Sequence, residues 1–248
     1  MKTYFNINYE FDKQEVHRQI ESAQKGYICV ADGVVLNTAN RDSHYLSVVN
    51  GGLLSICDSS WVPVYLKRIY GVEYEQYCGA DIFRDIVSSG KYRMIFMGTS
   101  QDILDGLRQE LMKMNPDVGG MQFVELPYLN VEEFNYPEIA QMIESDGAKI
   151  VWVALGAPKQ EQFMNRLLPY LEHGVMIGVG AAFKFYSGMA EKRCPEWMKN
   201  NHLEFVYRIM QDPKKQLKRC FWILRTLPKL YWEEKKRAEK CNYATDLT

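Results

Sequence analysis

The residues best suited to chemistry lie in the segment Ala154-Leu-Gly-Ala-Pro-Lys-Gln-Glu161, which follows an apolar run. Its glycine permits a tight turn, and Pro158 has the fixed φ that suits the first position of a helix. Lys159, Gln160 and Glu161 would then lie in the first helical turn, where unpaired N–H groups and the positive end of the helix dipole favour a diphosphate. An ordinary strand-to-helix turn has the same residues, and the spacing favours neither interpretation.

A glycine-rich segment, Gly178-Val-Gly-Ala-Ala-Phe-Lys-Phe-Tyr-Ser-Gly188, follows another apolar run. Gly178 and Gly180 would let the backbone approach a nucleotide, and Phe183 or Tyr186 would stack on its base or ribose. A dinucleotide-binding fingerprint has a third small residue where Phe183 stands, so that fingerprint is incomplete. The glycines can equally serve only to relieve packing under a helix.

Three aspartates stand near the ends of apolar runs or beside a glycine. Asp58 comes directly after Leu53–Cys57, and a carboxylate at that end of a parallel strand is well placed to take a proton from an incoming hydroxyl. An aspartate before two serines also commonly caps a helix or closes a turn, which the residues alone favour. The same two interpretations apply to Asp32 and Asp81.

Several chemistries lack their motifs. The chain has no GxxxxGK[ST] phosphate loop, no Gly-x-Ser-x-Gly elbow and no Asp-x-Asp of the kind that holds a divalent ion against a sugar nucleotide. Its four histidines lie far apart and its six cysteines include no CxxC pair, which argues against a zinc site and indicates reduced thiols in a cytoplasmic protein. We therefore expect no metal and no cofactor. In a sugar transferase, helix N-termini and cationic side chains would then meet the leaving-group charge.

The elements that would position these residues alternate along the chain. Short apolar runs rich in β-branched and aromatic residues predict strands, and the segments between them have helical spacing. The predicted strands are Tyr27–Val30, Leu53–Cys57, Arg93–Met97, Gln122–Leu126, Lys149–Leu155 and Val175–Val179. The predicted helices are Thr38–Asn50, Ala80–Ser89, Gln101–Met114, Val131–Ser145 and Lys159–Leu171. This alternation predicts an α/β fold with a mostly parallel, Rossmann-like sheet covered by helices on both faces.

The charge of the chain is uneven. Residues 196–248 carry twelve Lys and Arg against seven Asp and Glu, whereas residues 1–195 carry 18 against 24. We expect an α/β core over 1–195 and a basic helical appendage over 196–248 that meets an anionic surface. The acidic core disfavours nucleic acid as the partner. No apolar stretch approaches the roughly 20 residues that cross a bilayer, and the first residues lack the apolar segment of a signal peptide.

Within the appendage, one helix is predicted over Trp197–Met210 and another over Lys214–Thr226, with Pro228 interrupting the latter. Basic residues mixed with Trp, Tyr and Phe on an amphipathic helix suit the headgroup layer of a membrane. Packing on the core or on a second subunit is the alternative.

Taken together, these segments resemble the WecG/TagA/CpsF family of glycosyltransferases over nearly the whole chain. The matches, in chain order, are Cys78-Gly-Ala-Asp81 to a GxD turn, Ala154–Glu161 to the family signature without a change, Gly178–Phe183 to a GVGxxF loop, Lys192-Arg-Cys-Pro195 to a basic stretch, and Leu203–Arg208 with Asp212-Pro213 to an LEWxYR…EP segment.

The resemblance implies an inverting, metal-independent transfer from a UDP-activated N-acetylhexosamine or related sugar to a polyprenyl-diphosphate-linked saccharide at the inner face of the cell membrane. The family's catalytic-base aspartate falls on Asp58, which favours the base over the cap. Together with the segments above, it points to Asp32, Gly79, Asp81, Gly98, Thr99, Gly156, Lys159, Gln160, Glu161, Gly178, Gly180, Phe183, Lys184, Arg193 and Arg208 as substrate-binding residues, with Lys215, Lys218 and Arg219 as further candidates for diphosphate contact. A homo-oligomer is compatible with the sequence.

Three positions depart from the family pattern. Ser59 replaces the glycine after the base aspartate, Val30-Ala-Asp32 stands where the family has Thr-x-Asn, and Lys184 replaces a usually acidic residue. These departures leave open a catalytically inactive, membrane-recruited protein that binds nucleotide sugars. A third class, an NAD-dependent oxidoreductase, is disfavoured by the incomplete GxG loop.

Overall fold

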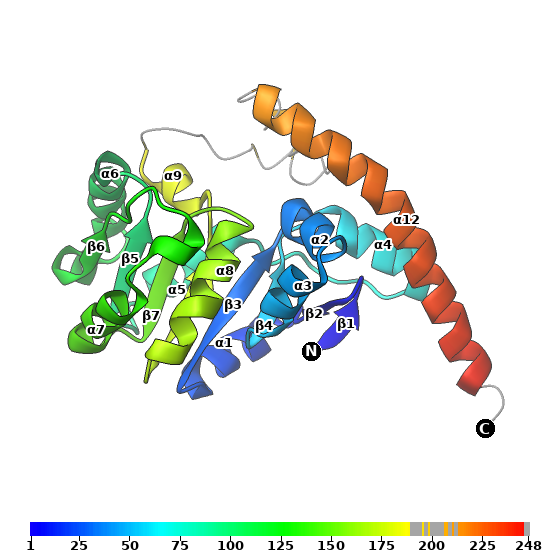
Figure 1. The fold of residues 1–248 in the computed structure, drawn as a ribbon, viewed down its shortest axis with the longest axis horizontal. Coiled ribbons are helices and arrows are strands. Elements are labelled where there is room, and N and C mark those ends of the chain that lie inside the picture. Colours follow the sequence, from blue (N-terminus) through cyan, green and yellow to red (C-terminus); the bar gives the residue numbers. More distant parts are fainter. Residues whose placement is uncertain (189–194, 196–197, 199–205, 208–209, 211–212, 246–248) are drawn as a thin grey trace.

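A computed structural model describes residues 1–188, 195, 198, 206–207, 210 and 213–245 (Figure 1). Its strands are β1 (Lys2–Tyr4), β2 (Ile7–Tyr9), β3 (Lys25–Ala31), β4 (Leu54–Cys57), β5 (Met94–Gly98), β6 (Gln122–Val124), β7 (Ile150–Ala154) and β8 (Gly174–Gly178). Its α-helices are α1 (Lys13–Ser22), α2 (Gly33–Ala39), α3 (Ser43–Asn50), α4 (Trp61–Tyr70), α5 (Gly79–Ser89), α6 (Gln101–Met112), α7 (Tyr136–Asp146), α8 (Lys159–Leu167), α9 (Ala182–Tyr186) and α12 (Pro213–Thr245), with short 3₁₀ helices η1 (Pro116–Gly120), η2 (Val131–Glu133) and η3 (Leu168–Tyr170).

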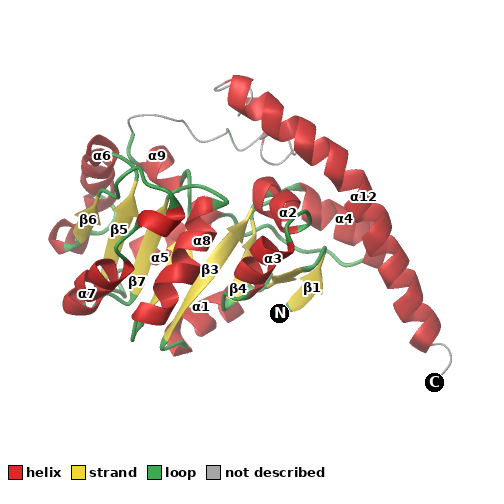
Figure 2. Cartoon of the chain, in the orientation of Figure 1, coloured by secondary structure: helices red, strands yellow, loops and turns green. Residues whose placement is uncertain are grey.

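All eight strands form one sheet in the order β1-β2-β4-β3-β8-β7-β5-β6. β1 and β2 are antiparallel, and every other neighbouring pair is parallel. β5, β7 and β8 are buried along their whole length, as expected where helices cover both faces. The predicted α/β class with a mostly parallel sheet is confirmed (Figure 2).

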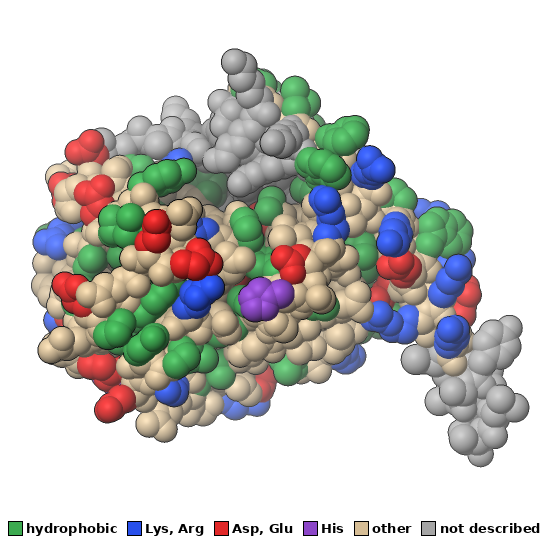
Figure 3. All heavy atoms as spheres, viewed as in Figure 1, with side chains coloured by type: hydrophobic (Ala, Val, Ile, Leu, Met, Phe, Trp, Pro, Cys, Tyr) green, Lys and Arg blue, Asp and Glu red, His purple; other side chains and the backbone are tan. Residues whose placement is uncertain are grey.

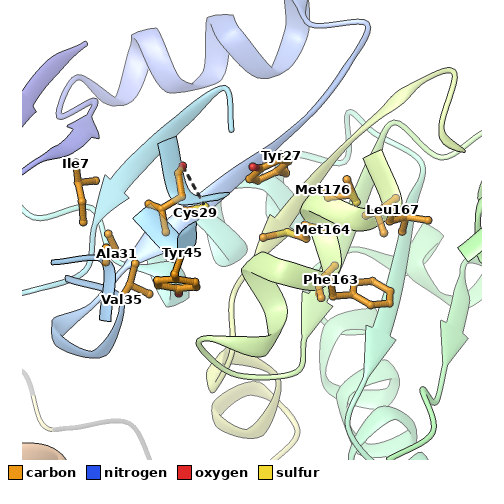
Figure 4. Close-up of a cluster of buried hydrophobic side chains, with 14 of the residues drawn as sticks. Ile7, Tyr27, Cys29, Ala31, Val35, Tyr45, Phe163, Met164, Leu167 and Met176 are labelled. Carbon is orange, nitrogen blue, oxygen red and sulfur yellow. Dashed lines mark hydrogen bonds between the residues drawn. The ribbon is translucent and has the colours of Figure 1, made fainter. Parts of the chain in front are cut away.

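Each face of the sheet carries its own core, because successive side chains of a strand point to opposite faces. Helices α2, α3, α4, α7 and α8 cover one face, where Tyr27, Tyr45 and Phe163 are fully buried. Figure 4 shows side chains from β3, α3 and α8 meeting in this core. Helices α1, α5, α6 and α9 cover the other face around Phe83 and Trp152, whose ring centroids lie 4.8 Å apart.

All six predicted strands are present, with ends that move by at most two residues. Three predicted helices differ. The helix predicted over Lys159–Leu171 ends as α8 at Leu167 and is followed by η3. Thr38–Asn50 is not one helix: α2 ends at Ala39, and the side chain of Asp42 accepts from the backbone of His44 and Tyr45 to begin α3. Val131–Ser145 begins as η2, and α7 starts only after Asn135, which caps it. Polar caps inside an apolar pattern divide a helix that periodicity alone would continue.

The first part of the chain adds elements that the sequence did not predict. β1 and β2 form a hairpin through Phe5 and Asn6, both at positive φ (50° and 65°), as a two-residue hairpin turn requires. Strands of three residues are too short to show an alternating pattern. The sequence analysis also did not predict α1 and α4.

The last helix, α12, runs through Pro228, which was expected to interrupt it. Pro228 is exposed, whereas Leu227 and Leu230 on either side are buried in the core that contains α2 and α4. Packing on both sides of a proline can hold a helix together across the lost hydrogen bond. Most of the helix predicted over Trp197–Met210 lies outside the described residues. Within the part of the chain that the structure describes, no helix has the length and apolar character needed to cross a membrane.

Candidate active site

The carboxyl ends of the parallel strands lie along one edge of the sheet, here called the rim (Figure 1). Asp58 follows β4, and its backbone N–H donates to the carbonyl of Ala31 at 3.1 Å. Asp58 therefore lies next to Asp32, which follows β3. The adjoining strand β8 continues into Val179 and Gly180, and β7 continues into the turn before α8. Ligands of open α/β sheets bind at such a rim.

The carboxylate of Asp58 contacts the start of α5. Its Oδ1 accepts from the backbone N–H of Gly79 at 3.1 Å, while Gln76 donates to the Asp58 carbonyl at 2.9 Å. The alternative for Asp58 was a cap on the helix or turn that directly follows it. The contact with Gly79 is not of this local kind, because Gly79 is 21 residues away. The residue that precedes α4, Ser60, makes no side-chain cap.

Gly79 connects Asp58 to the glycine segment after β8. A Cβ on Gly79 would lie 3.0 Å from Val30 Cγ1 and 3.7 Å from the carbonyl oxygen of Val179. A side chain at this position would therefore press on Val30 and contact the segment after β8. Asp58, Gly79 and the segment 178–180 meet at one place on the rim.

The other two aspartates have local partners. Asp32 Oδ1 caps α2, accepting from the backbone N–H groups of Val34 and Val35 at 2.8 and 2.9 Å. Asp81 lies in the first turn of α5, where Cys78 Sγ donates to it at 2.7 Å. The capping interpretation is therefore correct for Asp32, whose carboxylate still stands at the rim beside Asp58.

A chain of three buried polar side chains lies behind the glycine segment. Tyr45 Oη donates to Glu161 Oε2 at 2.9 Å, and Gln160 Nε2 donates to Glu161 Oε1 at 2.8 Å. Gln160 Nε2 also lies 3.4 Å from the carbonyl oxygen of Gly178. A Cβ on Gly178 would come within 3.1 Å of Gln160 Cδ, so glycine at this position leaves room for the amide. We call Tyr45, Glu161 and Gln160 the buried polar triad.

Burial raises the pKa of Glu161 from 4.5 to about 7, against the opposing effect of the hydrogen bonds from Gln160 and Tyr45. Glu161 is fully buried, so its carboxyl does not face the rim and its expected direct contact with substrate is absent from this arrangement. Tyr45 was missed by sequence analysis, because a tyrosine on the apolar side of a helix looks like an ordinary core residue.

Lys159 lies at the first position of α8 and points toward the segment before η2. Its Nζ donates to the carbonyl of Leu129 and lies 5.3 Å from the Tyr128 ring centroid and 5.1 Å from that of Phe134. Tyr128 is fully exposed. The ammonium group therefore sits at the β7 side of the rim, in reach of solvent.

The turn after β5 also has the geometry of a functional loop. A Cβ on Gly98 would lie 2.6 Å from the carbonyl oxygen of Ala154, and its φ is 110°, so only glycine fits. Thr99 has φ 56°, which is rare for a β-branched residue and recurs at functional sites. Gly156, at φ 78°, has nothing within 4 Å of a Cβ position, and its role in binding stays a prediction.

Phe183 does not stack on a ligand in this arrangement. Its side chain is fully buried, with its ring centroid 5.6 Å from that of Phe83 and 6.1 Å from that of Phe96. Tyr186 donates to the carbonyl of Ala80 at 3.0 Å and also packs on Phe83. Phe183 is thus part of the core on this face of the sheet, and Tyr186 packs against it. Lys184, between them on α9, is half-buried.

Arg193 and Arg208, together with most of the segments Lys192–Pro195 and Leu203–Arg208, lie outside the described residues, as do the side chains of Lys215, Lys218 and Arg219. Among the described residues, no three His, Cys, Asp or Glu side chains are grouped as a metal site.

The fold and the rim define an α/β protein that binds its ligand beyond the carboxyl ends of parallel strands, a class that includes many nucleotide-dependent enzymes. Within that class, the chain belongs to the Glycosyl transferase WecG/TagA/CpsF family, whose family model matches residues 4–240. The family expected from the sequence is confirmed, and the chain is thereby a member of a glycosyltransferase family.

Individual relatives agree with this assignment. The chain is 26% identical over 205 residues to an N-acetylglucosaminyldiphosphoundecaprenol N-acetyl-beta-D-mannosaminyltransferase of Bacillus subtilis (strain 168), covering 78% of each chain. It is 22% identical over 203 residues to a protein of the same name from Staphylococcus aureus (strain MW2), covering 79% of this chain and 76% of the relative.

Proposed function

We propose that the protein transfers a sugar, an N-acetylhexosamine or a related one, from UDP to a polyprenyl-diphosphate-linked saccharide, with inversion and without a metal. The product would enter a cell-surface polysaccharide or a teichoic-acid-type polymer. The observation that carries this proposal is the meeting of Asp58, Gly79 and the segment 178–180 at the rim of a glycosyltransferase-family fold. The name of the Bacillus and Staphylococcus relatives, which specifies an N-acetylmannosaminyl group and a lipid-diphosphate acceptor, supports both substrate classes.

In the proposed step, the acceptor hydroxyl oxygen bonds to the anomeric carbon while the carboxylate of Asp58 accepts the hydroxyl proton. The bond from that carbon to the UDP oxygen breaks, and its electron pair leaves with UDP. Attack and departure on opposite faces of the carbon invert its configuration. The hydrogen bond from Gly79 holds one oxygen of Asp58, which fixes the direction of the carboxylate before substrate arrives.

The leaving diphosphate would be stabilised at the β7 side of the rim. The start of α8 offers the positive end of a helix dipole, and Lys159 adds a cation whose Nζ donates to the carbonyl of Leu129 in this structure. Arg193 and Arg208, with Lys215, Lys218 and Arg219, remain the candidate contacts from the appendage. Asp32, Asp81, Gly98, Thr99, Gly156 and Lys184 remain candidate donor contacts.

We further place the protein in the cytoplasm, as a peripheral protein on the inner face of the membrane, with α12 as its contact. Leu217, Phe221 and Trp232 are exposed on α12, and Figure 3 shows Lys and Arg side chains interspersed with apolar ones along it. Such a surface suits an anionic headgroup layer. A second copy of the chain is the alternative occupant.

A donor panel tests the activity. The full chain is incubated with UDP-, GDP- and CMP-sugars and a short-chain polyprenyl-diphosphate saccharide, with and without EDTA, and nucleotide release is measured. The proposal expects release with a UDP-N-acetylhexosamine only when acceptor is present, unaffected by EDTA. Saturable nucleotide-sugar binding without transfer to any lipid acceptor would instead identify the inactive binding protein.

A further inference from the structure

The amide of Gln160 is held in one orientation by its surroundings. Its Nε2 faces two acceptors, Glu161 Oε1 at 2.8 Å and the carbonyl oxygen of Gly178 at 3.4 Å. Turning the amide over would bring its Oε1 against both oxygens, so the present orientation is the favourable one. The Gln160 side chain is only 3% exposed, which leaves little room for other rotamers.

This orientation leaves Oε1 of Gln160 buried without a hydrogen-bond partner among the described residues. The atom faces the glycine segment, because a Cβ on Gly180 would lie 3.6 Å from it. A buried acceptor with no donor is costly, and such a group in a native protein calls for an explanation, of which a donor on a bound ligand is one. The missing partner must supply an N–H or O–H at Gly180, one residue from Val179 and hence beside the place where Asp58 and Gly79 meet.

We propose that Gln160 accepts a hydrogen bond from an uncharged O–H or N–H donor of the nucleotide-sugar substrate, and that Glu161 and Tyr45 are positioning residues that hold its amide in the accepting orientation. The inference rests on the proposed function. It also changes the expected role of Gln160: a carbonyl oxygen and a phosphate oxygen are both acceptors and repel each other, so Oε1 does not bind the diphosphate.

The ionised form of Glu161 is the one that positions the amide. Both of its oxygens accept a hydrogen bond, one from Tyr45 and one from Gln160. If the carboxyl were protonated, its O–H would face one of these two donors and that hydrogen bond would be lost. The titratable groups that face it are Tyr45 from α3, Tyr27 and Cys29 from β3, and Asp32 at the end of β3. Burial raises the pKa of Tyr27, Cys29 and Tyr45, so these three remain neutral while Glu161, with a pKa of about 7, changes charge.

The test measures binding of the UDP-sugar selected in the donor panel, of UDP and of inorganic pyrophosphate, by calorimetry on the full chain. Gln160→Leu removes the acceptor, Glu161→Gln keeps the shape but not the charge, and Tyr45→Phe removes one hydrogen bond. Tyr136→Phe is the matched control, since the Tyr136 hydroxyl is also buried but donates to the carbonyl of Val131 and, among the described residues, makes no hydrogen bond to Gln160 or Glu161. Thermal unfolding of each variant checks that it is folded.

We expect Gln160→Leu to weaken sugar-nucleotide binding about tenfold or more, the scale of a lost buried hydrogen bond. Tyr45→Phe should weaken it less, Tyr136→Phe not at all, and pyrophosphate binding should stay within about twofold throughout. Wild-type affinity should fall as pH is lowered through 7, and Glu161→Gln should abolish this dependence while changing KM more than kcat. If UDP alone shows the loss, the donor group is on the nucleotide; if only the UDP-sugar shows it, the group is on the sugar.

Two results would overturn the inference alone, with transferase activity intact. One is unchanged sugar-nucleotide affinity in folded Gln160→Leu, and the other is an equal loss of pyrophosphate binding, which would place Gln160 on the phosphates. Absence of any nucleotide-sugar binding by the wild-type protein would instead overturn the proposed function and this inference with it.

Discussion

At the scale of single residues, the site uses groups that folding alone would not select. Burying Glu161 lowers stability once it ionises, and leaving Gln160 Oε1 without a hydrogen-bond partner lowers it further. Gly178 gives up side-chain packing and leaves room for the Gln160 amide, and Gly79 packs closely against Val30. Such local costs are typical of sites built for a ligand rather than for stability.

The raised pKa of Glu161 predicts a pH dependence of stability. The unfolded chain releases this proton near pH 4.5 and the folded chain near pH 7. The folded protein is therefore favoured by the proton on Glu161 below pH 4.5, and this contribution to the free energy of unfolding is lost as pH rises through about 7. The loss is on the order of 3 kcal/mol. Urea unfolding at pH 5 and pH 8 should show Glu161→Gln gaining stability relative to wild type as pH rises. A difference that is the same at both pH values would contradict the buried, titrating carboxyl.

Substitution of Gly178 tests the packing of the buried polar triad. In Gly178→Ala the new methyl would lie 2.9 Å from Met164 Cε and 3.1 Å from Gln160 Cδ, so the amide must move and sugar-nucleotide affinity should fall by about tenfold. Gly120→Ala is the control, since nothing lies within 4 Å of its Cβ position. Equal affinities for the two variants would show that the amide has freedom to shift.

At the scale of elements, the periodicity of apolar residues predicted the central strands and most helices. It missed the features that depend on a single polar contact. The central strands were evident because their apolar runs are continuous, and the rim followed from the rule that parallel strands present their carboxyl ends together. The break between α2 and α3 depends on one cap by Asp42. The role of Tyr45 depends on a hydrogen bond to a residue 116 positions away, which no local pattern contains.

A buried carboxylate contributes to the attachment of α12. Glu234 is 2% exposed and accepts from the backbone N–H of Phe5 at 3.0 Å and from Tyr70 Oη at 2.8 Å. Its Oε2 also receives Arg237 Nη1 at 3.1 Å. The appendage is therefore tied to both the first hairpin and α4, and a deletion from Pro213 would uncover part of the core.

Glu234→Ala should lower the free energy of unfolding by about 1–3 kcal/mol, because it leaves three donors without this acceptor. Glu233→Ala is the neighbouring control, since that side chain is 53% exposed and pairs only with Lys229 in the described structure; it should change stability by less than about 0.5 kcal/mol. Chemical denaturation compares them. Equal effects would mean that α12 is not held in this way.

At the scale of the whole molecule, the rim and the exposed side of α12 would have to serve one lipid-linked acceptor. In the proposed reaction the core would supply the reacting groups. Helix α12 packs on α2 next to Asp32, since a Cβ on Gly33 would meet Ile223 Cδ1 at 2.9 Å. The helix that would touch the membrane is thus in contact with an element of the rim. This arrangement would allow a membrane-held saccharide to reach Asp58 without leaving the surface.

The membrane role is tested by substitutions that leave α12 docked. Leu217→Ser with Phe221→Ser changes exposed side chains only and should weaken binding to anionic liposomes by about tenfold. Thr226→Ser, a mild change at a half-buried position of the same helix, serves as the control. Unchanged co-sedimentation of the double variant would contradict α12 as the contact, and loss of a dimer in light scattering would assign the surface to a second copy.

The most direct measurement compares Asp58→Asn with wild type in turnover and in donor binding. Asparagine keeps an oxygen for the N–H of Gly79 but cannot accept a proton, so donor affinity should stay within about twofold while turnover falls by about 100-fold or more. Asp42→Asn, at a helix cap that follows no strand, should leave both unchanged. Full turnover in Asp58→Asn would show that this carboxylate is not the base.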